Sequence, residues 1–141
     1  METWLEDLSE AASRRLLGTS VLGRLAVVVD GHPDVFPVNH VWDEDTGTVA
    51  FPSNHGTKLQ AALSQPTVAF ETDGVDDGNR SAWSVVVLGR AERVEDPADV
   101  ARVEAARVPL WRAGEGVEWL RVVPTRVTGR RISTIPATPA S

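Results

Sequence analysis

Short runs of β-branched and apolar residues, separated by turn signals, recur along this chain and restrict what it can fold into. Val21–Val29 is such a run, and Asp30-Gly31 with Pro33 after it is typical of a tight turn. Val35–Trp42 comes next, and Asp43–Gly47 has the composition of a second turn. These segments predict neighbouring strands that run antiparallel to one another.

Later segments extend the pattern to about six strands. The further predicted strands are Thr48–Phe51, Thr67–Thr72, Trp83–Val94 and Val117–Ile132. Pro37 has no N–H to donate, so we expect its strand at a sheet edge or a bulge, and Gly89 predicts a bulge in the long Trp83–Val94 segment. Six strands in one domain favour a mainly β fold, a closed or nearly closed antiparallel barrel, because closure removes exposed strand edges.

Three segments predict short helices that accompany these strands. Leu8–Thr19 has apolar residues on one face, with Ser9 as a candidate N-cap. Thr57–Ser64 is a short helix before a proline, and Asp96 caps a third helix that begins at Pro97. We expect one domain over residues 1–132 and a flexible C-terminal tail over residues 133–141.

Composition excludes several classes of function. The 141-residue chain has a formal net charge of −6, which argues against a general nucleic-acid binder or a protein of acidic membrane surfaces. It has no cysteine, so neither disulfides nor thiolate metal sites are expected. No stretch of about 18 apolar residues is present, and the acidic N-terminus lacks a signal pattern. A cytoplasmic location is therefore expected.

The single lysine of the chain, Lys58, lies at a distinctive place. It follows a strand-like run and a small polar loop with Gly56, and it falls in the first turn of the helix predicted from Thr57. A helix start presents free N–H groups and a partial positive charge, which suit an anion such as a phosphate. A cation at this point is unfavourable for the helix dipole unless an anion lies between the two. The alternative is a solvated lysine on an ordinary helix.

Other kinds of chemistry have weaker support in the sequence. His32, His40 and His55 have no partners at metal-ligand spacing, so no metal site is predicted. No Ser/His/acid set can be identified, and we predict no catalytic residue. Tryptophans placed at strand ends or in loops suit a core or an interface, and one or two could contact a planar ligand.

The order of these segments resembles a known family. These segments are, in order, the first helix followed by GRLAVV, PVNHVWD, FPSNHGTKL, VAFETDG, WSVVVLGRA and VTGRRI. In this order the chain resembles the pyridoxamine 5′-phosphate oxidase-like family of FMN-binding split β-barrels, in its short actinobacterial form. The resemblance extends from about Leu8 to Ile132. It implies a six-stranded split barrel that forms a homodimer, with two FMN molecules in grooves between the subunits.

The resemblance also implies which residues contact the cofactor. Thr57 and Lys58 match the pair that holds the phosphate, and Phe51, Pro52 and Ser53 match the strand end beside the ribityl chain and ring. The remaining positions carried over from the family are Val38 and Asn39 (backbone at the polar edge of the ring), Ser84 (ring edge) with its neighbour Trp83, and Arg130 with Trp119 (from the partner subunit).

The function implied is a flavin-dependent oxidoreductase acting on a small conjugated substrate. FMN supplies hydride transfer at its N5 atom, so no catalytic base is required from the chain. The segment RVTGRRI lacks the histidine that binds the substrate phosphate in true oxidases of the family, so pyridoxamine phosphate is not the expected substrate. Two alternatives remain: a reductase that uses the deazaflavin coenzyme F-420, and a non-catalytic cofactor- or haem-binding split barrel.

Overall fold

The computed structural model describes residues 3–53, 57–64, 67–76, 78, 80–106 and 117–134. Its strands are β1 (Trp4–Leu8), β2 (Leu22–Val29), β3 (His32–Asn39), β4 (Val41–Asp43), β5 (Thr48–Ser53), β6 (Thr67–Val75), β7 (Ser81–Arg93) and β8 (Glu118–Ser133), and its helices are α1 (Glu10–Leu17), α2 (Thr57–Ser64) and α3 (Pro97–Ala106). The predicted tail falls mostly on residues 135–141, which lie outside the described part of the chain.

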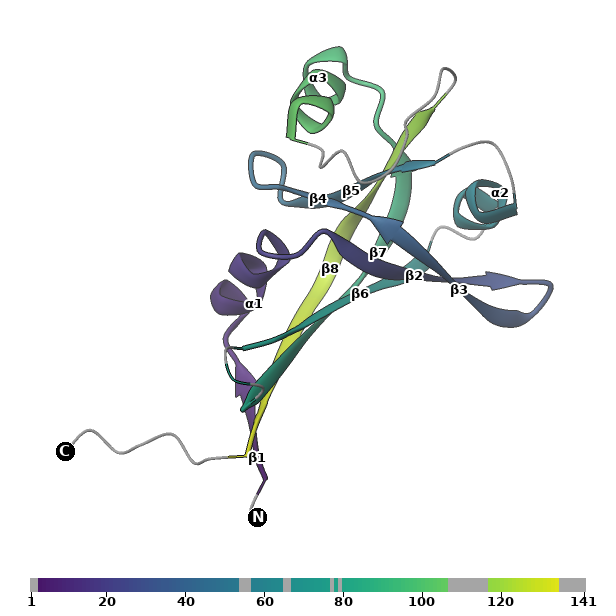
Figure 1. Ribbon diagram of the computed structural model, residues 1–141. Coiled ribbons are helices and arrows are strands. Elements are labelled where there is room, and N and C mark those ends of the chain that lie inside the picture. The colour runs from purple at the N-terminus through teal and green to yellow at the C-terminus, as the bar shows by residue number, and fades with distance from the viewer. Residues whose placement is uncertain are drawn as a thin grey trace.

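The strands form one antiparallel sheet in the order β3-β2-β6-β7-β8-β5-β4, and β1 pairs with the C-terminal end of β8. The sheet curls into a half-barrel around the long strands β7 and β8 (Figure 1). The prediction of a mainly β, antiparallel split barrel is thereby confirmed. The strand count differs, because β1 was not predicted and the expected strand Val35–Trp42 divides at His40 into β3 and β4.

Local signals account for the turns and helix starts. Asp30 and Gly31 both have positive φ angles, 51° and 81°, which is the geometry of the tight hairpin turn predicted between β2 and β3. The Ser9 hydroxyl accepts a hydrogen bond from the backbone N–H of Ala12 and caps α1. Asp96 accepts one from the N–H of Ala98, and α3 begins at Pro97 as expected.

Gly89 marks a bulge in β7, as the sequence predicted. The register between β7 and β8 shifts between Leu88 and Gly89. A Cβ at Gly89 would lie 2.2 Å from the backbone oxygen of Val123, so only glycine permits this close approach of the two strands. Pro37 lies in β3, which is an edge strand, where its missing N–H leaves no ladder bond unmade.

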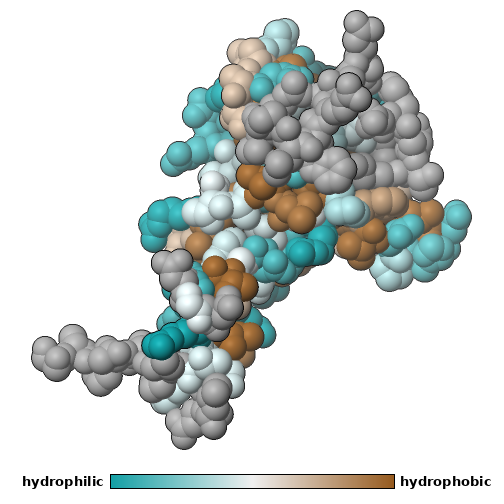
Figure 2. All heavy atoms as spheres, viewed as in Figure 1, coloured by the Kyte–Doolittle hydropathy of each residue, from teal (hydrophilic) through white to brown (hydrophobic). Residues whose placement is uncertain are grey.

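The main core lies inside the curl of the sheet. Phe51 and Phe70 are completely buried there, with leucines and valines from the central strands and from α1. A smaller cluster of Ala50, Val94, Val103 and Trp119 lies under α3. Apolar patches also remain on the surface, one of them over the β2–β3 hairpin at the right of Figure 2, where Val35 is exposed. Among the described residues, no helix is long and apolar enough to cross a membrane.

Candidate functional site

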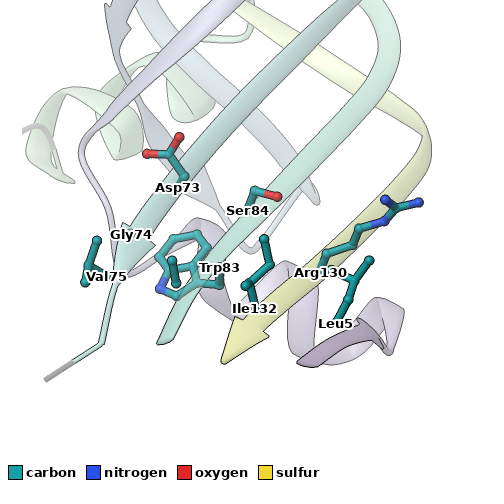
Figure 3. A pocket seen from close by; sticks show the side chains of 9 residues that line it. Leu5, Asp73, Gly74, Val75, Trp83, Ser84, Arg130 and Ile132 are labelled. Atoms are coloured by element: carbon teal, nitrogen blue, oxygen red, sulfur yellow. The ribbon is translucent and has the colours of Figure 1, made fainter. Parts of the chain in front are cut away.

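A pocket of about 480 Å³ lies where β6 and β8 end and β7 begins. Its lining residues are Leu5, Asp73, Gly74, Val75, Ala82, Trp83, Ser84, Arg130 and Ile132 (Figure 3). Three of the ten predicted cofactor-binding residues, Trp83, Ser84 and Arg130, are therefore together at this pocket. The sheet brings them together because β7 and β8 pair along almost their whole length.

The polar side of the pocket is a row of cross-strand neighbours. Asp73 of β6 pairs with Ser84 of β7, Ser84 pairs with Arg130 of β8, and Arg130 pairs with Asp7 of β1. Residues that pair directly across a sheet lie on the same face, so these four side chains form one polar row. The Arg130 Nε lies 3.6 Å from Asp7 Oδ1, and both side chains are mostly exposed.

The apolar side of the pocket is the adjoining row on the same strands. Val75 pairs with Ala82, Ala82 with Ile132, and Ile132 with Leu5. Leu5, Val75 and Ile132 are 58%, 63% and 46% exposed, which is high for large hydrophobic side chains. A flat apolar surface next to an arginine and a hydroxyl suits a planar ligand with polar edges.

Trp83 also lines the pocket, but its side chain is largely buried. It is 8% exposed and belongs to the main core cluster. A Cβ on Gly74 would lie 2.7 Å from the indole ring, so the ring packs closely over this glycine. Trp83 alternates with Ser84 along β7 and therefore faces the opposite side of the sheet. Its contribution is to support the pocket wall rather than to present an open aromatic face.

A charged cluster borders the pocket on β2 and β6. Arg24 Nη1 lies 2.5 Å from Glu71 Oε1 and 3.4 Å from Asp73 Oδ2. Partial burial and, secondly, the neighbouring Asp73 raise the pKa of the Glu71 carboxyl above its usual range. Arg24 therefore offsets much of the negative charge that the two carboxylates bring to this edge of the pocket.

The predicted residues of β5 lie far from this pocket. Phe51, Pro52 and Ser53 pair with Leu120, Trp119 and Glu118, at the N-terminal end of β8. Arg130 is twelve residues beyond Glu118 on the same strand, which corresponds to about 40 Å of extended chain. Within one chain, the structure therefore separates the predicted residues into a β5 group and a pocket group.

Val38 and Asn39 lie on β3, the edge strand at the other end of the sheet order from β4 and β5. Because the sheet curls, β3 packs against β5, so these two residues belong with the β5 group. The side chains of Val38 and Phe51 are buried in the core, where only their backbone could meet a ligand. Both polar atoms of the Asn39 side chain, Nδ2 and Oδ1, are buried and have no hydrogen-bond partner in the described part of the chain. Such an unpaired donor and acceptor are costly unless a ligand or water completes them.

The remaining predicted residues are Thr57, Lys58 and Trp119. The structure begins α2 at Thr57, which confirms the predicted helix start shortly after β5. The side chains of Thr57 and Lys58 lie outside the described atoms. Trp119 is 3% exposed and donates a hydrogen bond from Nε1 to Glu104 Oε1 of α3 (2.8 Å), so its ring is part of the smaller core.

The sequence reasoning did not identify the apolar row or Asp73 as pocket residues. The alternation in TVAFETDGV continues through Val75, so Asp73 and Val75 share the outward face of β6. The sequence therefore contained the signal for this face of β6. It did not contain the pairing of β1 with the end of β8, which completes the apolar row. Among the described residues, no cluster of histidine and carboxylate side chains could hold a metal ion.

Comparison with known proteins shows where this architecture recurs. Residues 9–131 match the family described as pyridoxamine 5′-phosphate oxidase. The uncharacterized protein Rv0080 of Mycobacterium tuberculosis is 32% identical over 138 residues, which cover 94% of this chain and 89% of that protein. The FAD binding protein of Mycobacterium smegmatis is 37% identical with a TM-score of 0.75, covering 92% of this chain and 100% of that one. A FAD-binding protein of Mesorhizobium loti has 25% identity, a TM-score of 0.81, and coverage of 94% and 99%.

Proposed function

The chain belongs to the pyridoxamine 5′-phosphate oxidase family, and from this premise we propose that it is a homodimeric, flavin-dependent oxidoreductase that acts on a small conjugated substrate. The observation that carries the proposal is the separation of the predicted residues into two groups. A flavin mononucleotide is much shorter than the stretch of β8 from Glu118, which pairs with Ser53, to Arg130. One cofactor can contact both groups only if they come from two chains.

A two-fold homodimer supplies this arrangement. In an isologous dimer each surface of one chain meets the complementary surface of the other, so two equivalent sites form. Each site would combine the β5 group of one chain with Ser84 and Arg130 of its partner. The exposure of about half or more of each side chain in the apolar row of Leu5, Val75 and Ile132 agrees with a surface that a cofactor or a second chain covers. A cytoplasmic location remains part of this proposal.

The residues present fit a flavin. The N–H groups at the start of α2, together with Lys58, would hold the phosphate. The unpaired amide of Asn39 has an NH2 group that donates and a carbonyl oxygen that accepts, which would match an adjacent acceptor and donor on the flavin pyrimidine edge. Ser84 and Arg130 would complete the polar contacts from the partner chain. When bound, the flavin supplies hydride transfer, and this chain's residues bind it, orient it and limit the access of water.

The volume of the exposed pocket favours a small substrate over a large one. The open space of about 480 Å³ beside the polar row would be shared by the ring and the molecule stacked on it. Pyridoxamine phosphate itself is not proposed, because the segment around Arg130 carries arginines without the histidine expected for its phosphate. FMN is the proposed cofactor. FAD, which the name of the Mycobacterium smegmatis protein includes, is its main competitor.

The proposal is tested by titrating the purified full-length protein with FMN, FAD and the deazaflavin F-420 and recording visible absorption. We expect FMN to bind and to remain bound through gel filtration. The variant Lys58→Ala should weaken FMN binding by about 1.5–3 kcal/mol, because it removes a charge-assisted contact to phosphate. Arg15→Ala, which removes an exposed cation from α1, is the matched control and should bind FMN normally.

Other outcomes of the same titration identify the alternatives. Preference for the deazaflavin would make the protein a deazaflavin-dependent reductase. A Soret band would indicate the haem-binding alternative. FMN affinity that is unchanged in Lys58→Ala would contradict the phosphate role proposed for that residue.

A further inference from the structure

We propose that Asp73 makes the candidate site selective for a flat organic cation that carries no anionic group. This rests on the proposed flavin site and names the class of substrate that would stack on the ring. Among the described residues, the charged side chains that line the pocket are Asp73 and Arg130. Arg130 belongs to the flavin contacts from the partner chain, so Asp73 is the charged group left to face the substrate.

Asp73 and Arg130 lie on opposite sides of Ser84 (Figure 3). Asp73 pairs with Ser84 across β6 and β7, and Ser84 pairs with Arg130 across β7 and β8. Two interstrand spacings place the backbones of Asp73 and Arg130 about 10 Å apart. This spacing allows Arg130 to contact the edge of one ring while Asp73 contacts a second molecule stacked on that ring.

One arginine serves two carboxylates on the Asp73 side of the pocket. Arg24 Nη1 lies 2.5 Å from Glu71 Oε1 but 3.4 Å from Asp73 Oδ2, so Asp73 has the looser contact. The Asp73 side chain is also 49% exposed. Burial and, secondly, the neighbouring Asp73 raise the pKa of the Glu71 carboxyl, as expected for two carboxylates that repel each other. A cation beside Asp73 would relieve this repulsion, and an anion would add to it.

The charge balance of the site favours a cation. The polar row and the charged cluster that borders it contain two arginines, Arg24 and Arg130, and three carboxylates, Asp7, Glu71 and Asp73. Once the flavin engages Arg130, the remaining charge on these described side chains is more negative still. An anionic substituent on the substrate would find no cation available to it here.

The apolar row supplies the surface for the body of the substrate. Val75 lies two residues beyond Asp73 on the same face of β6, about 7 Å along the strand. Its neighbours in the row, Leu5 and Ile132, are 58% and 46% exposed. A flat apolar body placed on this row would be removed from water while its cationic end reaches Asp73. The pocket therefore matches a ligand with one apolar and one cationic end.

The proposal is tested with benzamidine, benzamide and benzoate, three flat molecules of similar size that are cationic, neutral and anionic at neutral pH. Each is titrated by calorimetry into the full-length protein loaded with FMN. We expect benzamidine to bind at least about tenfold more tightly than benzamide, because its two parallel N–H groups and positive charge suit a carboxylate. Benzoate should bind most weakly of the three.

Variants separate Asp73 from a general effect of the negative net charge. Asp73→Asn keeps the size of the side chain, and it should reduce the preference for benzamidine over benzamide at least about fivefold. Glu44→Gln removes a charge from an exposed position between β4 and β5 and should leave the preference unchanged. An unaltered preference in Asp73→Asn, equal binding of benzamidine and benzamide, tighter binding of benzoate, or no binding of any of the three at millimolar concentration would overturn the proposal.

FMN binding is measured separately by visible absorption, so failure of the substrate class can be distinguished from failure of the cofactor site. FMN that binds to a protein without preference for benzamidine would contradict the role of Asp73 alone. A protein that binds no flavin would contradict the proposed function, and the role of Asp73 would fail with it.

Discussion

His40 is an ionisable side chain held in the protein interior. It is 4% exposed, its Nε2 lies 3.0 Å from the carbonyl oxygen of Leu17, and its ring meets Phe70 edge to face at 4.8 Å. Its Nδ1 has no partner within the described part of the chain. Burial lowers the pKa of the imidazole below its ordinary value, although the backbone contacts act in the opposite direction.

This burial predicts a pH dependence of stability. At pH values well above about 6.5 His40 is neutral in both the folded and the unfolded chain and contributes no pH dependence. As the pH falls below that value the unfolded chain takes up the proton first, so the free energy of unfolding should decrease by up to about 1.4 kcal/mol per pH unit. Urea unfolding between pH 7.5 and 5.5 measures how the free energy of unfolding changes with pH. His40→Gln should lose this component, and a slope identical to that of the wild type would contradict it. His32→Gln, at an exposed position, is the control.

Individual residues differ in how far the sequence could predict them. Ser9, Pro97 and the Asp30-Gly31 turn were predictable because caps and turns depend on neighbours within a few positions. The orientation of Trp83 was not, since it depends on which residue of another strand lies opposite. The structure places its ring over Gly74, a contact set by the register of β6 and β7.

At the scale of elements, α3 is attached to the sheet through charge. Arg102 donates to both carboxylate oxygens of Asp43, on β4, at 2.7 Å each, and also to Asp99. The hydrogen bonds from Arg102 lower the pKa of Asp43. Asp43 is 4% exposed, so its charge depends on this partner far more than a surface carboxylate would.

A double-mutant cycle measures this attachment. With Arg102→Gln, Asp43→Asn and the double variant, we expect a coupling of about 1.5–3 kcal/mol in the free energy of unfolding, the range for hydrogen bonds to charged groups. The control pair is Arg14 and Glu10, which are 3.4 Å apart and exposed on α1. Their coupling should be below about 0.5 kcal/mol. Equal couplings for the two pairs would contradict the structural role assigned to Asp43.

The bulge in β7 gives a second prediction for an element. Gly89→Ala should destabilise the protein by about 1–3 kcal/mol, because the added Cβ would force β7 and β8 apart at Val123. Gly18→Ala is the matched control, since the nearest atom to its Cβ would be at 3.5 Å, an ordinary contact. Thermal unfolding of the two variants compares them. A loss of stability at Gly18 as large as that at Gly89 would show that packing at the bulge is not the cause.

Elements with strong periodicity were predicted, and weaker ones were not. The strands around Val27, Val87 and Val122 are rich in β-branched residues and bury alternate side chains, as their sequences indicated. β1 was missed because WLEDL is almost entirely exposed and is a strand only through its pairing with β8. The division of β3 from β4 at His40 was also missed, because it follows from tertiary packing.

At the scale of the whole molecule, the register of β8 decides how the candidate site can be assembled. The sequence and its family resemblance predicted which residues would contact a flavin, but not that β5 and Arg130 would lie at opposite ends of one strand. Pairings between distant segments depend on the complete fold, so no local pattern encodes that distance. The family resemblance already implied a site shared by two chains, and the separation is the structural observation that supports it.

Complementation between two defective chains tests this shared site directly. Lys58→Ala and Arg130→Gln are each expected to weaken flavin binding in their own homodimers. A site shared between chains predicts that mixed dimers contain one site with intact Lys58 and intact Arg130, so after equal mixing and exchange about one quarter of all sites should regain wild-type affinity. Flavin titration of the mixture, compared with each variant alone, measures that fraction. Recovery of these high-affinity sites is the predicted result, and a mixture that binds no better than its two components would contradict the shared site.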